Sequence, residues 1–253
     1  FIEWLKISTE IIKVLGLKKI PHFTSLQKVA KRIKKTLLEY VMLGFFFLTR
    51  LRKIHGSGDG TGLKASTASS YYTACLERYK RKKRRGRKKK RRKIKKHIHP
   101  LILIELRLQI ILAAIIRRGP LNEAPLVIPL LKKLKDLIKK LRKFLYDKAA
   151  DAEYIHEFVR NLGADSIIPV RNKEVPIRRT KGQYRKQMKR KFPKKEFKKR
   201  KRSETVNSVV KRIMGEELLS QKWWMQDKEL ILRFIAYNAY RISIIFYIIK
   251  ILE

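Results

Sequence analysis

Apolar residues recur at helical spacing within the first 50 residues of the chain. Lysines and an arginine fill the positions between them, so one face of this segment is apolar and the other is basic. Thr24, followed three residues later by Gln27, has the spacing of a capping box and predicts the start of a helix. The apolar positions are Leu26, Val29, Ala30 and Ile33.

The remaining chain alternates between short apolar runs and longer stretches of helical periodicity. Residues 51–73 are rich in Gly and Ser and carry turn signals, whereas residues 98–118 contain two Ile/Leu-rich runs that predict a β-hairpin. Residues 171–199 are basic and show little periodicity. The other predicted elements are helices over 126–141, 151–162 (with Gly163 as its C-cap), 200–214 and 216–252, and strands over 143–147 and 166–170.

The predicted elements follow one another as strand, hairpin, helix, strand, helix, strand and helix. This order is typical of an α/β fold with a ribonuclease-H-like mixed sheet flanked by helices. We therefore predict an N-terminal helical region over residues 1–50 and a ribonuclease-H-like domain over residues 51–253. The C-terminal helices of this domain are expected over residues 216–252.

The charge balance indicates the kind of partner. The 253 residues include 65 Lys and Arg against 21 Asp and Glu, a formal net charge of +44. A polyanion relieves this self-repulsion by exchanging its counterions for contacts with the protein. Nucleic acid is therefore the first expected partner and an anionic membrane surface the second. Residues 1–50 fit either a DNA-binding region or a plain amphipathic helix with solvated lysines.

Two basic segments stand out, over residues 78–97 and 171–199. In the first, 15 of the 17 residues from 80 to 96 are Lys or Arg. Such a block is typical of a solvated arm, a nuclear-localisation signal or a surface that binds a polyanion. We expect both segments to follow the DNA backbone. The side chains predicted to do so are Lys82, Arg84, Arg87, Lys89, Arg91, Arg185 and Lys189.

Cysteine usage and hydropathy narrow the class of protein further. Cys75 is the single cysteine, which excludes a disulfide within the chain and fits a reducing compartment. No apolar run reaches the roughly 18 residues of a membrane span, and the nearest, over 234–252, is predicted to be a buried terminal helix. His97 and His99 have a spacing more typical of a surface strand than of a zinc site. The chain begins with Phe1, so we expect its start to be missing.

Three acidic residues occupy positions that a ribonuclease-H-like sheet brings to one edge. Asp59 lies at or just after the first strand, Asp147 ends a later strand, and Glu204 lies on the helix after the last strand. Three carboxylates repel one another unless divalent cations lie between them, and oxygen ligands favour Mg²⁺ or Mn²⁺. Two such ions about 4 Å apart activate a nucleophile and stabilise the leaving oxygen in phosphoryl transfer.

Each carboxylate also has a plain structural explanation. Asp59 and Gly60 form a common turn pair, Asp147 fits the residue before a helix, and Glu204 is spaced to pair with Arg200 on a solvated face. The face of the helix around Glu204 nevertheless suits a phosphodiester, because Arg binds a phosphate through two hydrogen bonds and Lys adds a point charge. The residues on that face are Phe197, Arg200, Ser208 and Lys211. The opposite face, predicted to be buried, has Val206, Val209, Val210 and Ile213.

The segment 197–211, FKKRKRSETVNSVVK, resembles the YREK signature of DDE transposases from prokaryotic insertion sequences. Arg200, Glu204 and Lys211 match this signature in type and spacing, and Phe197 stands where the family has Tyr. Other stretches resemble the family over nearly the whole chain. They are PHFTSLQKVAKR (21–32), DGTGLK (59–64) around the first aspartate, RRGPLNEAPLVIPLL (117–131), YDKAAD (146–151), where the family's second aspartate maps onto Asp147 rather than Asp151, and the tail 220–241.

The resemblance implies a DNA transposase that binds the terminal inverted repeats of a mobile element, cuts the DNA and joins the freed 3′-hydroxyl to target DNA. It implies that Asp59, Asp147 and Glu204 hold two Mg²⁺ (or Mn²⁺) ions, and that Arg200, Lys211 and Phe197 position the DNA. The expected partners are double-stranded DNA, as transposon ends and as target, and a second copy of the chain, with no membrane. The expected location is the cytoplasm of a prokaryote, with the nucleoid. The alternatives are an inactive DNA-binding relic of such an element and an RNA-binding structural protein.

Overall fold

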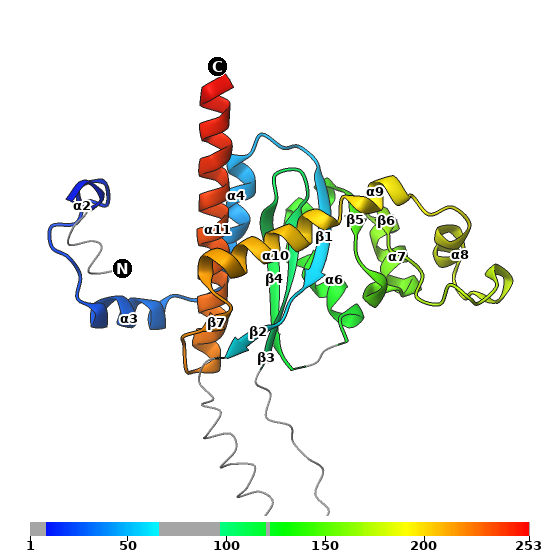
Figure 1. Ribbon diagram of the computed structural model, residues 1–253, viewed down its shortest axis with the longest axis horizontal. Coiled ribbons are helices and arrows are strands. Elements are labelled where there is room, and N and C mark those ends of the chain that lie inside the picture. Colours follow the sequence, from blue (N-terminus) through cyan, green and yellow to red (C-terminus); the bar gives the residue numbers. More distant parts are fainter. Residues whose placement is uncertain (1–8, 66–96, 120–121, 253) are drawn as a thin grey trace, which may run out of the picture.

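A mixed β-sheet forms the centre of the computed structural model, which describes residues 9–65, 97–119 and 122–252 (Figure 1). The strands pair in the order β6-β5-β1-β3-β2-β7, and β4 pairs with β3. β1 and β5 are parallel, as are β5 and β6, whereas β3 runs antiparallel to β1 and β4. The strands are β1 (Ile54–Gly60), β2 (Leu63–Ala65), β3 (His97–Glu105), β4 (Ile110–Arg118), β5 (Leu141–Leu145), β6 (Asp165–Ile167) and β7 (Glu217–Leu218).

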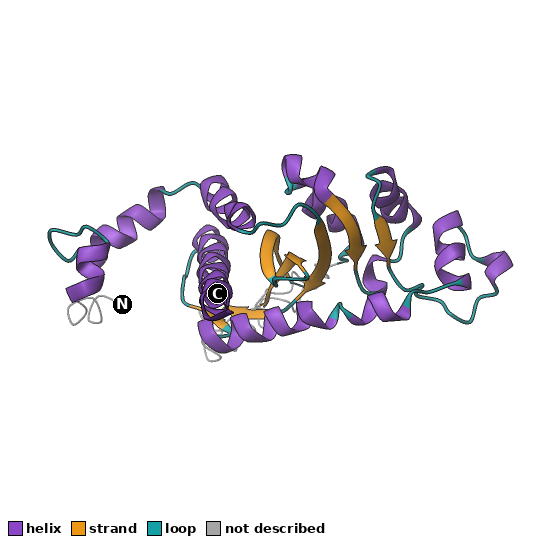
Figure 2. Ribbon diagram, turned by 90° about the horizontal axis from the view of Figure 1, so that it is seen from above, coloured by secondary structure: helices purple, strands orange, loops and turns teal. Residues whose placement is uncertain are grey.

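Helices cover both faces of this sheet (Figure 2). α6 and α7 pack on one face and α10 on the other, while α4 and α11 lie together beside β4. The α-helices are α2 (Thr9–Val14), α3 (Phe23–Arg32), α4 (Lys35–Leu48), α6 (Ala124–Lys132), α7 (Glu153–Asn161), α8 (Gln183–Arg190), α9 (Lys194–Lys198), α10 (Lys201–Met214) and α11 (Trp223–Leu252). Short 3₁₀ helices are η1 (Lys135–Lys140), η2 (Lys148–Ala150) and η3 (Ile177–Arg179).

Strand β3 is buried on both faces, which explains its unbroken apolar run. Leu101 and Leu103 belong to the hydrophobic cluster shared with α6 and α7. Ile102 and Ile104 point the other way, into the cluster shared with α10 and α11. The alternation of side chains along the strand therefore fixes which helices lie over which face. The mixed α/β architecture with helices on both faces is compatible with the predicted ribonuclease-H-like fold.

Helix α11 satisfies the backbone of strand β4, which has β3 as its strand neighbour. The fully buried side chain of Asn238 accepts a hydrogen bond from the Ile111 N–H (2.8 Å) and donates one to the Ile111 carbonyl (2.7 Å). Tyr237 and Arg241 donate to the carbonyls of Gln109 and Leu108. A helix that pairs with a strand in this way covers polar groups that otherwise favour aggregation.

The segment Trp223–Ile248 of α11 is the one described helix long and apolar enough, by length and composition, to cross a membrane. Its middle packs in the core, where Leu230, Ile231 and Phe234 are at most 2 % exposed. Phe246 and Tyr247 near its end are exposed, so the predicted burial of the terminal helix holds for its middle alone. The absence of a membrane partner stays a prediction.

Several predicted elements differ from the observed ones. The helix predicted over 126–141 is wrong in its second half, because α6 ends at Lys132 and a 3₁₀ helix leads directly into β5. Lys135, at the start of that 3₁₀ helix, has a φ of 54°, which breaks the helical path. The hairpin over 98–118 is confirmed by β3 and β4. Residues 171–199 form η3, α8 and α9 despite their weak periodicity. The first strand, expected at Asp59, is β1, and β2 follows it within the Gly/Ser-rich segment.

The N-terminal region divides into two parts. α3 begins one residue earlier than the predicted capping box, and the His22 side chain rather than Thr24 caps it, accepting from the Thr24 N–H. α3 has no buried residue. α4, by contrast, contributes Met42 and Phe46 to the main core, each 1 % exposed. DNA binding by residues 1–50 stays a prediction.

Candidate active site

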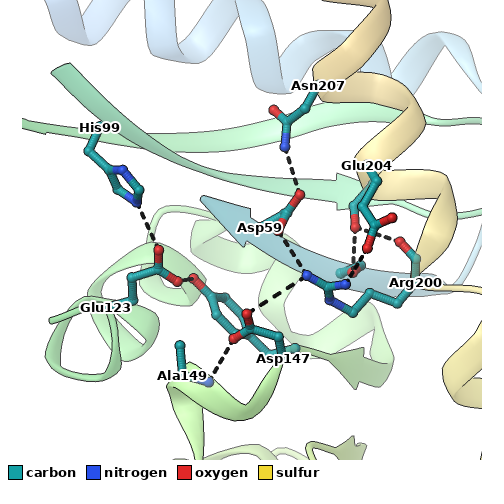
Figure 3. A network of polar contacts seen from close by, with 11 residues as sticks. Asp59, His99, Glu123, Asp147, Ala149, Arg200, Glu204 and Asn207 are labelled. Carbon is teal, nitrogen blue, oxygen red and sulfur yellow. Dashed lines mark hydrogen bonds and ion pairs between the residues drawn. The ribbon is translucent and has the colours of Figure 1, made fainter. Parts of the chain in front are cut away.

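The structure brings the three predicted carboxylates around the guanidinium of Arg200 (Figure 3). Arg200 Nη2 lies 3.1 Å from Asp59 Oδ1 and 3.9 Å from Asp147 Oδ2, and Nη1 donates to Glu204 Oε1 at 2.6 Å. The residues come from β1, from the turn after β5 and from α10. Residues far apart in the sequence thus meet at one point.

The strand arrangement accounts for this meeting. β1 and β5 are parallel neighbours, so Asp59 near the end of β1 and Asp147 just after β5 lie at the same edge of the sheet. α10 crosses β1, and its Glu204 comes from that side. Ser57 and Ser203 are both fully buried at this crossing, with their hydroxyl oxygens 3.4 Å apart, and their small side chains allow the helix to approach the strand.

Asp59 is the most enclosed of the three carboxylates. Its side chain is 13 % exposed, against 40 % for Asp147 and 57 % for Glu204. Burial raises the pKa of Asp59, although Arg200 and a hydrogen bond from Asn207 act in the opposite direction. Asn207 Nδ2 donates to Asp59 Oδ2 at 2.7 Å. The Arg200 cation and the Asn207 amide therefore offset part of the loss of water around this carboxylate.

Asp147 and Asp151, both candidates for the second aspartate, have different environments. The Asp147 side chain accepts a hydrogen bond from the Ala149 N–H at 2.7 Å, which begins η2, and its other oxygen faces Arg200. The side chain of Asp151 is fully buried and accepts two hydrogen bonds from Arg185, at 2.7 and 2.8 Å. Asp151 therefore has a structural role, and Asp147 is the aspartate that lies at the carboxylate cluster.

The same contacts involve two residues predicted to bind the DNA backbone. The Arg185 guanidinium is committed to Asp151. Lys189 donates to the carbonyls of Asn172 and Val175, which holds the loop before α8 in place. Their contact with DNA stays a prediction. The other five residues of that prediction, Lys82, Arg84, Arg87, Lys89 and Arg91, lie outside the described residues.

The remaining residues of the predicted site flank the cluster. The ring of Phe197 packs edge-on against Phe192, with centroids 5.1 Å apart, so it is part of a small apolar cluster. Lys211 is half-buried in the last turn of α10 and forms no ion pair with another described residue. The face of α10 predicted to be buried is shifted: Ser203, Val206, Asn207 and Val210 are buried, whereas Ile213 is 44 % exposed.

An open groove of about 1100 Å³ has Asp147 and Arg200 among its lining residues. Its lining combines the aromatic rings of Phe192 and Phe197 with basic side chains from η2 and from the segment after β6. Apolar and aromatic surface contacts bases, and basic side chains contact phosphates. The groove therefore suits a nucleic-acid strand beside the carboxylates. The basic side chains include Lys148, Arg171, Lys173, Lys189 and Lys194.

The donor set fits a divalent metal, although the described residues contain no group of three Asp, Glu, His or Cys placed to hold one in this arrangement. The guanidinium of Arg200 is itself a cation between the three carboxylates. A divalent metal ion, like this guanidinium, would be held by surrounding carboxylates and would neutralise their charge. Carboxylate oxygens suit Mg²⁺ and Mn²⁺. A metal ion bound by all three carboxylates would therefore have to take the place of the guanidinium.

Sequence reasoning missed four residues near this cluster. Asn207 holds Asp59, and its signal was a polar residue on an otherwise apolar helix face, three residues after Glu204. Glu123 accepts hydrogen bonds from the Tyr146 hydroxyl (2.9 Å) and from His99 Nε2 (2.8 Å). His99, interpreted from its spacing as a surface residue, is therefore part of an internal network. No local pattern connects these three residues.

Comparison with known proteins assigns the chain to a family. No curated protein and no solved structure matches the sequence. A model of the family described as "Transposase DDE domain" matches residues 52–239, which include Asp59, Asp147 and Glu204. Because this match covers most of the chain, the protein belongs to the transposase DDE-domain family.

Proposed function

We propose that this transposase cleaves and joins DNA at a site in which Asp59, Asp147 and Glu204 hold two Mg²⁺ or Mn²⁺ ions. Transposases of the DDE type generally use divalent metal ions. The observation that carries the proposal is the meeting of three carboxylates from separate elements around one cation. A purely structural pair of Arg200 and Glu204 needs neither Asp59 nor Asp147.

The residues at the site have different proposed roles in the reaction. Bound metal ions would supply a Lewis acid that activates water or a 3′-hydroxyl and stabilises the leaving oxygen. Asp59, fixed by Asn207, and Asp147, fixed by the turn that it caps, would hold their carboxylates in place without rearrangement. Arg200, once released from the carboxylates, is within reach of a phosphate in the adjoining groove.

The substrate that we propose is double-stranded DNA, as the terminal inverted repeats of a mobile element and as target. The charge of +44 and the basic lining of the groove support a phosphate backbone as the ligand. We also propose membership of the YREK group of prokaryotic insertion sequences, with Phe197, Arg200 and Lys211 positioning the DNA. A homodimer in the cytoplasm, associated with the nucleoid, completes the proposal.

Replacing Glu204 with glutamine tests the site directly. The amide keeps the volume but loses the anionic ligand, so we expect nicking of plasmid DNA in MnCl₂ to fall about 100-fold or more. Folding and DNA binding, measured by circular dichroism and fluorescence anisotropy, should stay near those of the unmodified chain, because the Glu204 side chain is 57 % exposed.

Glu157→Gln is the matched control, since Glu157 is an exposed glutamate on α7. Full nicking activity in Glu204→Gln would contradict the site assignment. An unmodified chain that binds DNA and does not nick it in Mg²⁺ or Mn²⁺ would favour the inactive relic instead.

A further inference from the structure

A second polar network lies against strand β1, next to the carboxylate cluster. The Tyr146 hydroxyl donates to Glu123 Oε2 at 2.9 Å. His99 Nε2 donates to Glu123 Oε1 at 2.8 Å (Figure 3). Tyr146 is 1 % exposed, and the side chains of Glu123 and His99 are 15 % and 24 % exposed. The network joins β3, the residue before α6 and the residue after β5.

The network is built around an ionised carboxylate. The hydrogen bond from His99 lowers the pKa of Glu123, burial acts in the opposite direction, and the hydrogen bond from Tyr146 adds to the lowering. Hydrogen bonds to a charged acceptor are about twice as strong as those between neutral groups. Glu123 therefore holds two donors in defined positions, one in β3 and one directly after β5.

Two glycines in strand β1 allow the strand to lie in contact with this network. A Cβ atom at Gly58 would lie 2.2 Å from Tyr146 Cε2, and one at Gly60 would lie 2.3 Å from Glu123 Oε1 and 2.6 Å from His99 Nε2. No real Cβ approaches so closely, so only glycine permits the observed contact. The two positions flank Asp59, which explains why the strand before and after this acid lacks the apolar side chains expected of a central strand.

The geometry connects the network to both aspartates. Gly58 and Gly60 face the network, so by strand alternation Asp59 faces the other side of the sheet, where Arg200 and Asn207 contact it. Tyr146 directly precedes Asp147. The Tyr146 ring, held in place by the hydrogen bond of its hydroxyl to Glu123, contacts Gly58 and so sets the spacing of β1 and β5 where each presents its aspartate.

We propose that His99, Glu123 and Tyr146 form a positioning network that sets the separation of the Asp59 and Asp147 carboxylates from the opposite face of the sheet. This inference rests on the proposed metal site. None of the three residues touches the reacting atoms. The network acts by holding two metal-ligating carboxylates at the separation that a pair of ions requires.

Tyr146→Phe is the decisive variant, because it removes one hydroxyl and keeps the ring against Gly58. We expect the affinity of the protein for Mn²⁺, measured by calorimetry without DNA, to fall at least threefold. We expect kcat for nicking to fall about tenfold, with KM for DNA unchanged. Tyr154→Phe, at an exposed tyrosine on α7, is the matched control and should change neither.

A pair of variants at Glu123 separates positioning from packing. Glu123→Gln keeps an acceptor for Tyr146 and should retain most of the Mn²⁺ affinity, whereas Glu123→Ala should lose as much as Tyr146→Phe. Lower thermal stability in Tyr146→Phe with unchanged Mn²⁺ affinity and kcat would overturn the positioning role and leave the proposed function intact. If the unmodified chain neither binds Mn²⁺ nor nicks DNA, the proposed function fails and this inference fails with it.

Discussion

Replacing Arg200 with glutamine removes the guanidinium that contacts all three carboxylates, and its effect should depend on metal. The Asp59 and Arg200 side chains are 13 % and 15 % exposed, so their hydrogen bond belongs to the class that contributes roughly 1.5–3 kcal/mol. The pairs with Glu204 and Asp147 involve more exposed carboxylates, and each contributes under about 1 kcal/mol. Without metal, Arg200→Gln should therefore lower the free energy of unfolding by about 2–3 kcal/mol.

Bound metal should restore much of the stability that Arg200→Gln loses. In the unmodified protein a divalent ion must first displace the guanidinium. In Arg200→Gln no cation lies between the carboxylates, so the variant should bind metal more tightly. A tenfold gain in metal affinity adds about 1.4 kcal/mol to the stability at saturating metal. For a chain of this size 1 kcal/mol shifts Tm by roughly 2–4 °C. The Tm of the variant should lie about 5–10 °C below that of the unmodified protein without metal, and roughly half that far below it in excess MnCl₂.

Thermal unfolding followed by circular dichroism, with and without MnCl₂, measures both differences, and titration calorimetry measures the affinity. Arg212→Gln, at an exposed arginine on the same helix, is the matched control and should show no metal-dependent difference. An equal rise of Tm with metal in the variant and in the unmodified chain would refute the competition between Arg200 and metal.

Three further predictions concern stability. Asp151→Asn should lower the free energy of unfolding by about 3 kcal/mol in urea titrations, because it leaves the buried end of the Arg185 pair without its charge; a loss below 1 kcal/mol would show that the pair is dispensable. Asn238→Ala should cost about 2–3 kcal/mol, since the Ile111 N–H and carbonyl lose their partner, and a near-neutral result would mean that water replaces the amide. Hydrogen bonds from Lys143 and Lys199 lower the pKa of Glu196 from 4.5 to about 2, so its contribution is present above pH 4.5 and is lost as the pH falls towards 2. The free energy of unfolding of Glu196→Gln should accordingly fall less over that pH range than that of the unmodified chain. An equal fall in both proteins would contradict the lowered pKa of Glu196.

Local patterns were sufficient to predict the parts of the site that lie on one element. The spacing of Arg200 and Glu204 places them on one helix face whatever the rest of the fold does, because helical periodicity is a local property. The apolar runs of the β3–β4 hairpin are similarly local. The buried face of α10 was predicted less well, since Ser203 and Asn207 are buried only through their contacts with Ser57 and Asp59.

The sequence by itself indicated a polyanionic partner through its charge, the α/β order of elements, and three acids placed at the first strand, at the end of a later strand and on a helix. Tertiary structure alone decided which groups those acids contact. Arg200 is 141 residues from Asp59, and Asn238 is 127 residues from Ile111, so no local pattern encodes either hydrogen bond. The same holds for Asp151, whose burial against Arg185 depends on how the segment after β6 folds back. Such contacts follow from the strand order, which brings distant residues together, and the side chains that meet there fix the electrostatics of the site.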